Sequence, residues 1–199
     1  MNSFETSFLQ KNFIVNELLV LAWAASVQRA NVYKKGQKPS DVQKFRRAVL
    51  DFVQALIPKY VDGCEEQAHS RNLQLLCQHA TTKGAAILID GTYRLGVAQK
   101  LLNLILKYLW CSGLIAEPPH CPVDRIVLDL GRVSREICWT RMESLDEYLL
   151  AIRSLSNCAI AEQSSLAHWE LTCYQRRAGN FLDIERALMV NIPRLAVVA

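Results

Sequence analysis

The chain has 199 residues, of which 51% are apolar. It is therefore long enough for one domain of ordinary size and too apolar for an intrinsically disordered protein. The net charge of +4 is too small to identify a partner, but its distribution is informative. Residues 29–47 contain seven basic residues and one acid, so this segment carries +6 and the rest of the chain −2.

The N-terminal region does not have the pattern of a signal peptide, because Glu5 and Lys11 precede any apolar run. The uncharged stretch over 18–28 is too short to span a bilayer. Seven cysteines are scattered singly, without a Cys-x-x-Cys pair. This usage is typical of reduced, mostly buried thiols, and we expect a cytoplasmic protein.

Helical periodicity is frequent and strand signals are scarce, which predicts an all-α protein. A first helix is predicted over 13–31, and because it is apolar on most faces we expect it to be largely buried. A loop with Gly and Pro follows over 32–39. Ser40 is a good N-cap for a second helix, which runs to Leu56 and is ended by Pro58.

The middle of the chain continues this pattern. A third helix is predicted over 65–79, followed by a break at 81–84. The short apolar stretch 85–90 fits a turn or a helix, and residues 91–96 form a turn. A long apolar helix is then predicted over 97–110.

A proline-rich, rigid loop follows at 113–122, and Asp124 is placed to cap a further helix. Two amphipathic helices are predicted over 144–161 and 165–177. The economical interpretation is a single all-α domain over 1–199, built as one body or as two lobes around a cleft.

The long apolar helix carries a polar stripe. Asn103 and Lys107 follow Lys100 by three and by seven residues, which puts all three on one face of the helix. Such a stripe lines either solvent or a cleft. At the start of a helix and partly buried, Lys100 would be favoured as a neutral amine, the nucleophilic form. The competing interpretation is an exposed lysine that ends the helix.

Asp124 follows Lys100 by 24 residues, directly after Pro122 and Val123. The helix from Lys100 to its end rises about 16 Å. The twelve residues 112–123 can span roughly 40 Å when extended. The loop is therefore long enough to bring Asp124 back beside Lys100. The competing interpretation is that Asp124 is only a helix cap.

The pattern Gly-Val-x-x-Lys at a helix start, followed after a loop by Pro-Val-Asp, resembles the helix-hairpin-helix DNA glycosylase superfamily. The resemblance covers residues 85–125. The matching segments are 85–90 for the hairpin, 91–96 for its turn and 97–110 for its second helix. The small size and the lack of an appended domain further resemble the bacterial anti-phage glycosylases that act on glucosylated hydroxymethylcytosine in T-even phage DNA.

The resemblance implies roles for individual residues. Lys100 matches the lysine that attacks C1′ of the sugar and forms a Schiff base. Asp124 matches the carboxylate that stabilises positive charge on the sugar. Gly96 matches the hairpin glycine whose amide approaches a DNA phosphate, and Ala98 stands where the family has a second glycine. The four-cysteine iron–sulfur cluster of some members is absent from the sequence, and no metal or cofactor is expected.

A flipped base needs a pocket that reads it by stacking and polar contacts. The candidates lie at the end of the first helix and in the proline-rich loop: Gln28, Asn31, Tyr33 and His120. The alternative to a pocket role is that Gln28 and Asn31 simply end the first helix, and that His120 is a packing or surface residue. Three further ring-bearing residues are expected in the core: Trp139, His168 and Trp169.

The basic run is the expected contact with DNA phosphates. Its members are Arg29, Lys34, Lys35, Lys38, Arg46 and Arg47. The leading hypothesis is a monomeric DNA glycosylase that flips a modified base from double-stranded DNA and leaves an abasic site. Uracil, oxidised, alkylated and bulky phage bases all remain candidate substrates. Two alternatives are a non-enzymatic helix-hairpin-helix DNA-binding module, which needs no Asp124, and a helical protein–protein adaptor with a solvated basic face.

Overall fold

The computed structural model describes residues 3–174, which form seven α-helices and three short 3-10 helices without a strand. The all-α prediction is confirmed for this part of the chain. The α-helices are α1 (Ser3–Val27), α2 (Pro39–Leu56), α3 (Glu66–Gly84), α4 (Leu95–Cys111), α5 (Arg125–Leu130), α6 (Leu145–Ala161) and α7 (Leu166–Cys173). The 3-10 helices are η1 (Ile57–Tyr60), η2 (Ile89–Gly91) and η3 (Trp139–Arg141).

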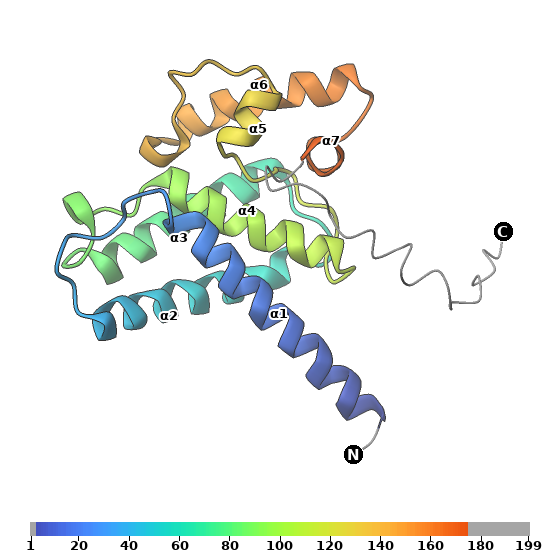
Figure 1. Cartoon of the computed structure of the whole chain (residues 1–199). Helices are drawn as coiled ribbons and strands as arrows, with labels where there is room; N and C mark the ends of the chain where they lie inside the picture. Colours follow the sequence, from blue (N-terminus) through green and yellow to red (C-terminus); the bar gives the residue numbers. More distant parts are fainter. Residues whose placement is uncertain (1–2, 175–199) are drawn as a thin grey trace.

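Helix α4 lies at the centre of the molecule. It packs against α1, α3, α6 and η3. Helices α1 to α3 lie on one side of it, and α5, α6 and α7 lie together on the other side (Figure 1). Most residues of α4 are buried, because an apolar surface on nearly every face can be covered only by neighbours all round.

Helix α2 presents one apolar stripe to the core. The stripe consists of Phe45, Val49, Val53 and Leu56, at helical spacing. The helix starts at Pro39, and the preceding Lys38 occupies the N-cap position without a side-chain bond. The prediction of Ser40 as the N-cap is therefore wrong by two residues, since proline favours the first helical position.

Helix α1 begins ten residues earlier than predicted, and the expectation that it is largely buried is wrong. Ala22, Trp23 and Ser26 are buried, on the half that packs on α4. Phe8 and Phe13 are 59% and 63% exposed, and the N-terminal half extends away from the other helices (Figure 1). Within residues 3–174 no helix combines the length and apolarity needed to cross a bilayer.

The connection between α3 and α4 also differs from the expected hairpin. Helix α3 continues to Gly84, so the predicted break at 81–84 is wrong. A side chain at Gly84 would overlap the ring of Phe45, so this closely packed last turn has room only for glycine. The chain then reverses through Asp90 and Gly91, whose φ angles are 55° and 67°. Glycine and aspartate are suited to this left-handed turn.

The basic loop after α1 is attached to this connection. The amide of Lys34 donates to the carbonyl of Ile87 at 2.9 Å, and that of Ile89 donates to Val32 at 3.0 Å. The guanidinium of Arg94, the N-cap residue of α4, donates to the carbonyl of Ala30. The loop therefore lies at the N-terminal end of α4.

Each of the three C-terminal helices has a side-chain N-cap, and the predicted cap at Asp124 is confirmed. Asp124 caps α5, and Ser165 caps α7. Ser144 and Glu147 form a capping box at the start of α6, in which each side chain accepts a bond from the other's backbone amide. Helix α7 ends at Cys173, because the backbone of Tyr174 is extended. The predicted continuation of this helix is therefore wrong at residue 174, and residues 175–177 lie outside the described residues.

Candidate active site

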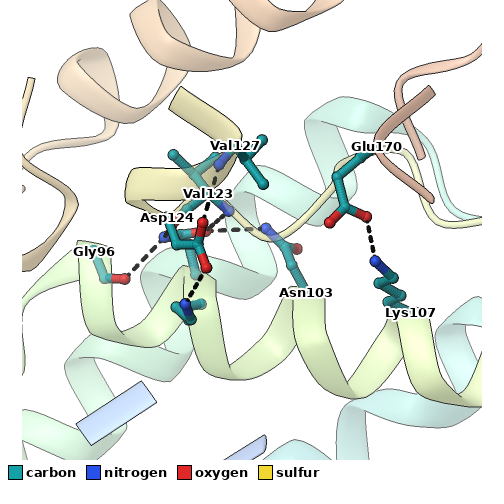
Figure 2. A network of polar contacts seen from close by, with 9 residues as sticks. Gly96, Asn103, Lys107, Val123, Asp124, Val127 and Glu170 are labelled. Atoms are coloured by element: carbon teal, nitrogen blue, oxygen red, sulfur yellow. Dashed lines mark hydrogen bonds and ion pairs between the residues drawn. The ribbon is translucent and has the colours of Figure 1, made fainter. Parts of the chain in front are cut away.

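Lys100 and Asp124 meet in the space between α4 and α5. Lys100 Nζ lies 2.6 Å from Asp124 Oδ2, and the two side chains are only 10% and 12% exposed. The other carboxylate oxygen accepts a hydrogen bond from the Val127 amide at 3.1 Å (Figure 2). The expected return of the loop to the start of the long helix is thus confirmed. The carboxylate is fixed from two sides, by an ammonium group and by the first turn of α5.

The ammonium group also faces an aromatic ring. Lys100 Nζ lies 4.7 Å from the centroid of the Trp139 ring. Trp139 belongs to η3 and is buried, as expected from its sequence. A cation above an indole face is favourable, and more so when it is desolvated. Lys100 is therefore held between a carboxylate and an aromatic ring, which together restrict its position.

Gln99 attaches the loop to α4. Its Nε2 donates to the Val123 carbonyl at 2.7 Å, and its Oε1 accepts from the Val123 amide at 3.0 Å. The same Nε2 also lies 3.0 Å from the Gly96 carbonyl. Gln99 is completely buried. Sequence reasoning missed this residue, because a buried glutamine in an apolar helix has no periodic signal of its own.

Asn103 holds the loop one turn further along α4. Its Nδ2 donates to the Cys121 carbonyl at 3.1 Å and to the Tyr148 hydroxyl of α6 at 2.9 Å. It is completely buried. The polar face of α4 predicted from the sequence is therefore covered by the loop here, and it faces polar backbone groups instead of solvent.

Lys107 completes the stripe with a second ion pair. Its Nζ lies 2.5 Å from Glu170 Oε2 of α7, and the two side chains are 12% and 2% exposed (Figure 2). The same Nζ lies 4.7 Å from the Tyr174 ring centroid. Burial raises the pKa of Glu170, and the charge of Lys107 acts in the opposite direction. Sequence reasoning placed Lys107 on the correct face but did not identify Glu170 as its partner.

His120 lies inside the protein, next to a second histidine. Its Nδ1 is 2.9 Å from the Tyr148 hydroxyl, and its ring centroid is 4.8 Å from that of His69 on α3. His120 Nε2 lies 3.3 Å from Glu66 Oε1, without hydrogen-bond geometry. Burial lowers the pKa of His120, and Glu66 acts in the opposite direction. The structure therefore supports the packing interpretation of His120.

The other proposed pocket residues lie at the N-terminal end of α4. Gln28 and Asn31 are exposed. Tyr33 is half-buried and makes an edge contact with Phe45, with ring centroids 6.1 Å apart. These three residues belong to the connection between α1 and α2, so they do not share a loop or helix with His120. The expected core positions of Trp139 and Trp169 are confirmed, whereas His168 is exposed and that expectation is wrong.

Gly96 has a packing role in this structure. Its amide donates to the Met142 carbonyl at 2.9 Å. A Cβ atom at this position would lie 1.7 Å from the carbonyl oxygen of Trp139. Both Gly96 and Ala98 are buried. The amide expected at a DNA phosphate is thus bonded within the protein, because η3 packs directly on the first turn of α4.

Most of the basic run is exposed at the surface. Lys34 is exposed as well, but its Nζ also donates to the carbonyls of Ala85 and Ala86 at 3.4 and 3.0 Å, near the end of α3. Arg46 is half-buried. The exposed members are Arg29, Lys34, Lys35, Lys38, Lys44 and Arg47. Lys83 of α3 adds to this basic surface, since it and Lys44 line the same pocket of about 410 Å³; sequence reasoning missed it.

A pocket of about 360 Å³ adjoins η3, on the segment that carries Trp139. Its lining is apolar and charged: Ile137, Cys138, Met142 and Leu150, with Glu136, Arg141 and Glu147. Lys100 and Asp124 do not line it. Among residues 3–174, no three His, Cys, Asp or Glu side chains converge as a metal site would require.

No protein-family model, curated protein or solved structure matches this chain. Function is therefore inferred from the chemistry of the residues that the fold brings together.

Proposed function

We propose that the protein is a DNA glycosylase that uses Lys100 and Asp124 to cleave the N-glycosidic bond of a modified base and leave an abasic site. The observation that carries the proposal is the buried contact of 2.6 Å between Lys100 Nζ and Asp124 Oδ2. An amine beside a carboxylate provides a nucleophile and a base that can take its proton. The fixed carboxylate also stabilises the positive charge that develops on the sugar as the bond breaks.

Two routes fit this pair. In the covalent route Lys100 passes a proton to Asp124, and its amine adds to C1′ while the base leaves with the bonding electrons and takes up a proton. Ring opening then gives a Schiff base, which water hydrolyses. In the direct route Asp124 activates a water that adds to C1′, and Lys100 only positions the carboxylate.

The exposed basic surface supports binding to double-stranded DNA, because lysine and arginine side chains neutralise phosphates. The small size of the chain, which resembles that of the bacterial anti-phage glycosylases, makes DNA with glucosylated hydroxymethylcytosine the first substrate to test. Excision of such a base would act in defence against phages.

The decisive variant is Asp124→Asn. Asparagine is as good an N-cap as aspartate, so α5 remains capped while the negative charge is lost. We expect excision to fall on the order of 10²–10³-fold, with DNA affinity unchanged; the melting temperature should also fall, because Lys100 loses its buried partner. The assay scores abasic sites in a panel of modified DNAs that includes T-even phage DNA.

Asp129→Asn is the matched control, because Asp129 lies on the same helix and is exposed. Unchanged excision by Asp124→Asn would refute the proposed mechanism. Salt-dependent DNA binding without release of any base would favour the non-enzymatic DNA-binding module instead.

Borohydride separates the two routes. If the route is covalent, reduction traps an enzyme–DNA adduct that Lys100→Ala lacks and that Lys59→Ala, a change at an exposed lysine on η1, retains. Normal excision without an adduct would assign the direct route and give Lys100 a positioning role.

A further inference from the structure

We propose that Gln99 is a positioning residue of this site, whose side-chain amide holds Val123 so that the next residue, Asp124, meets Lys100. The inference rests on the proposed function for its kinetic readout, and a second readout below is independent of catalysis. Nothing in the sequence pattern singles out this glutamine, so the contacts of its amide carry the inference.

One side-chain amide satisfies both backbone groups of a single residue. The bonds to the Val123 carbonyl and amide are 2.7 and 3.0 Å long, within the range of good hydrogen bonds. Gln99 and Val123 are both fully buried. Water is therefore not available to replace either bond, and losing the amide would leave two buried backbone groups without partners.

These two bonds act directly on the carboxylate. Val123 and Asp124 share a peptide bond, so fixing both backbone groups of Val123 fixes where the Asp124 side chain starts. That side chain then reaches the Val127 amide at 3.1 Å and Lys100 Nζ at 2.6 Å. Misplacing a catalytic group by about 1 Å can cost roughly 10²-fold in rate.

The rest of the loop has its own attachment. Asn103 bonds the Cys121 carbonyl, and His120 contacts Tyr148 of α6. A change at Gln99 should therefore move Val123 and Asp124 without releasing the loop from the core. This separates a positioning effect from a general loss of folding.

Gln99→Glu tests the inference through pH. An ionised carboxylate can accept from the Val123 amide but has no proton for the Val123 carbonyl. A protonated carboxyl group has one donor and one acceptor, and it restores both bonds. The ionisable groups that belong to the same network, Lys100, Asp124, His120 and Tyr148, are present in both proteins, so the comparison uses the ratio of variant to wild-type rates.

We expect the ratio of kcat values, variant over wild type, to be highest at pH 5.5 and to fall as pH rises to 8.5. Burial raises the pKa of a carboxyl group introduced here above the usual value of about 4.3. Above that pKa the ratio falls by up to about tenfold per pH unit, because the protonated fraction of the introduced carboxyl group falls by the same factor. DNA affinity should stay unchanged. A ratio that is constant with pH would overturn the inference.

Two further variants serve as controls. Asn72→Asp makes the same amide-to-acid change at a buried residue of α3, which bonds the Tyr60 hydroxyl at 3.1 Å, and its rate ratio should be flat. Gln99→Met removes both bonds at every pH, so its ratio should be uniformly low. If Gln99→Glu does not fold at high pH, a wild-type rate in Gln99→Met would still refute the inference.

Amine labelling gives the second readout, without DNA. Acetic anhydride is applied at pH 8, and acetylation of Lys100 is quantified relative to Lys107 in the same digest. Gln99→Glu should raise this ratio to the value of Asp124→Asn, because Lys100 loses its partner in both. An unchanged ratio refutes the positioning of Asp124. If labelling responds but wild type excises no base, the proposed function fails while the positioning stands.

Discussion

The structure leaves no room for a side chain at Gly96, where the carbonyl oxygen of Trp139 lies 1.7 Å from the site of a Cβ atom. We expect Gly96→Ala to lower the free energy of unfolding by about 3 kcal/mol, at the upper end of overpacking costs. To accommodate the methyl group, the backbone at Trp139 or Gly96 must move, and this movement would strain the hydrogen bond from the Gly96 amide to the Met142 carbonyl. Urea denaturation measures the change.

Gly131→Ala is the matched control. There the nearest atom to an added Cβ is the end of the flexible Leu155 side chain, at 2.3 Å, so a smaller loss is expected. The sign of the Gly96 result is informative, because alanine in a helix interior without a clash is up to about 1 kcal/mol better than glycine. A stabilised Gly96→Ala protein would contradict the close packing of η3 on α4.

Single residues also show what could be predicted from the sequence. Lys100 and Asp124 could be found because a helix face, a loop length and a capping position each leave a pattern. Gln99 and Glu170 could not, because their partners are a distant backbone group and a lysine on another helix. Such partners depend on how helices pack, which no local spacing encodes.

Between α3 and the loop over 113–122, two buried histidines make stability depend on pH. Burial lowers the pKa of His69 to about 3, and neighbouring His120 acts in the same direction. The unfolded chain binds a proton near pH 6.5, so the folded state binds fewer protons below that pH. Stability is therefore complete above about pH 6.5 and is lost as pH falls towards 3.

We expect His69 to lower the free energy of unfolding by up to about 1.4 kcal/mol per pH unit as pH falls through that window. His69→Gln should make the slope shallower, because one proton-linked group is removed. Urea denaturation of both proteins at pH 7.5, 6, 5 and 4 measures the difference. Equal slopes would show that His69 is not the linked group.

At the level of elements, periodicity identified most helices but not how they are covered. The apolar pattern of α1 is compatible with burial, and only packing shows that Phe8 and Phe13 are exposed. Helix α3 continues through Gly84 because the ring of Phe45 packs against that glycine. The local sequence pattern that predicts a break does not show that another helix makes a favourable contact there.

Among residues 3–174, the basic run forms one positively charged region at the level of the whole molecule, around the start of α2 and the end of α3. Each phosphate that a protein neutralises adds about 0.9 to the slope of log affinity against log salt. We expect Lys35→Ala combined with Lys38→Ala to lower that slope by up to about 1.8 for double-stranded DNA. Fluorescence anisotropy at several salt concentrations provides the measurement.

Lys59→Ala provides the control, because Lys59 lies on η1, outside the basic run, and its slope should equal that of wild type. An unchanged slope in the double variant would show that Lys35 and Lys38 do not contact DNA phosphates and that the contact lies elsewhere. The all-α class of residues 3–174 was predictable from composition and periodicity. The partition of helices around α4 was not, because it depends on contacts between segments that are distant in sequence.

The two ion pairs on α4 differ in how much chain must be closed to form them. Lys100 and Asp124 are 24 residues apart, whereas Lys107 and Glu170 are 63 apart. Loop-closure entropy grows with the logarithm of this separation, so the first pair has the smaller cost. During synthesis from the N-terminus, Asp124 also emerges well before α7. The pair of Lys100 and Asp124 can therefore form early on α4, whereas the pair of Lys107 and Glu170 forms only after α7 has been synthesised.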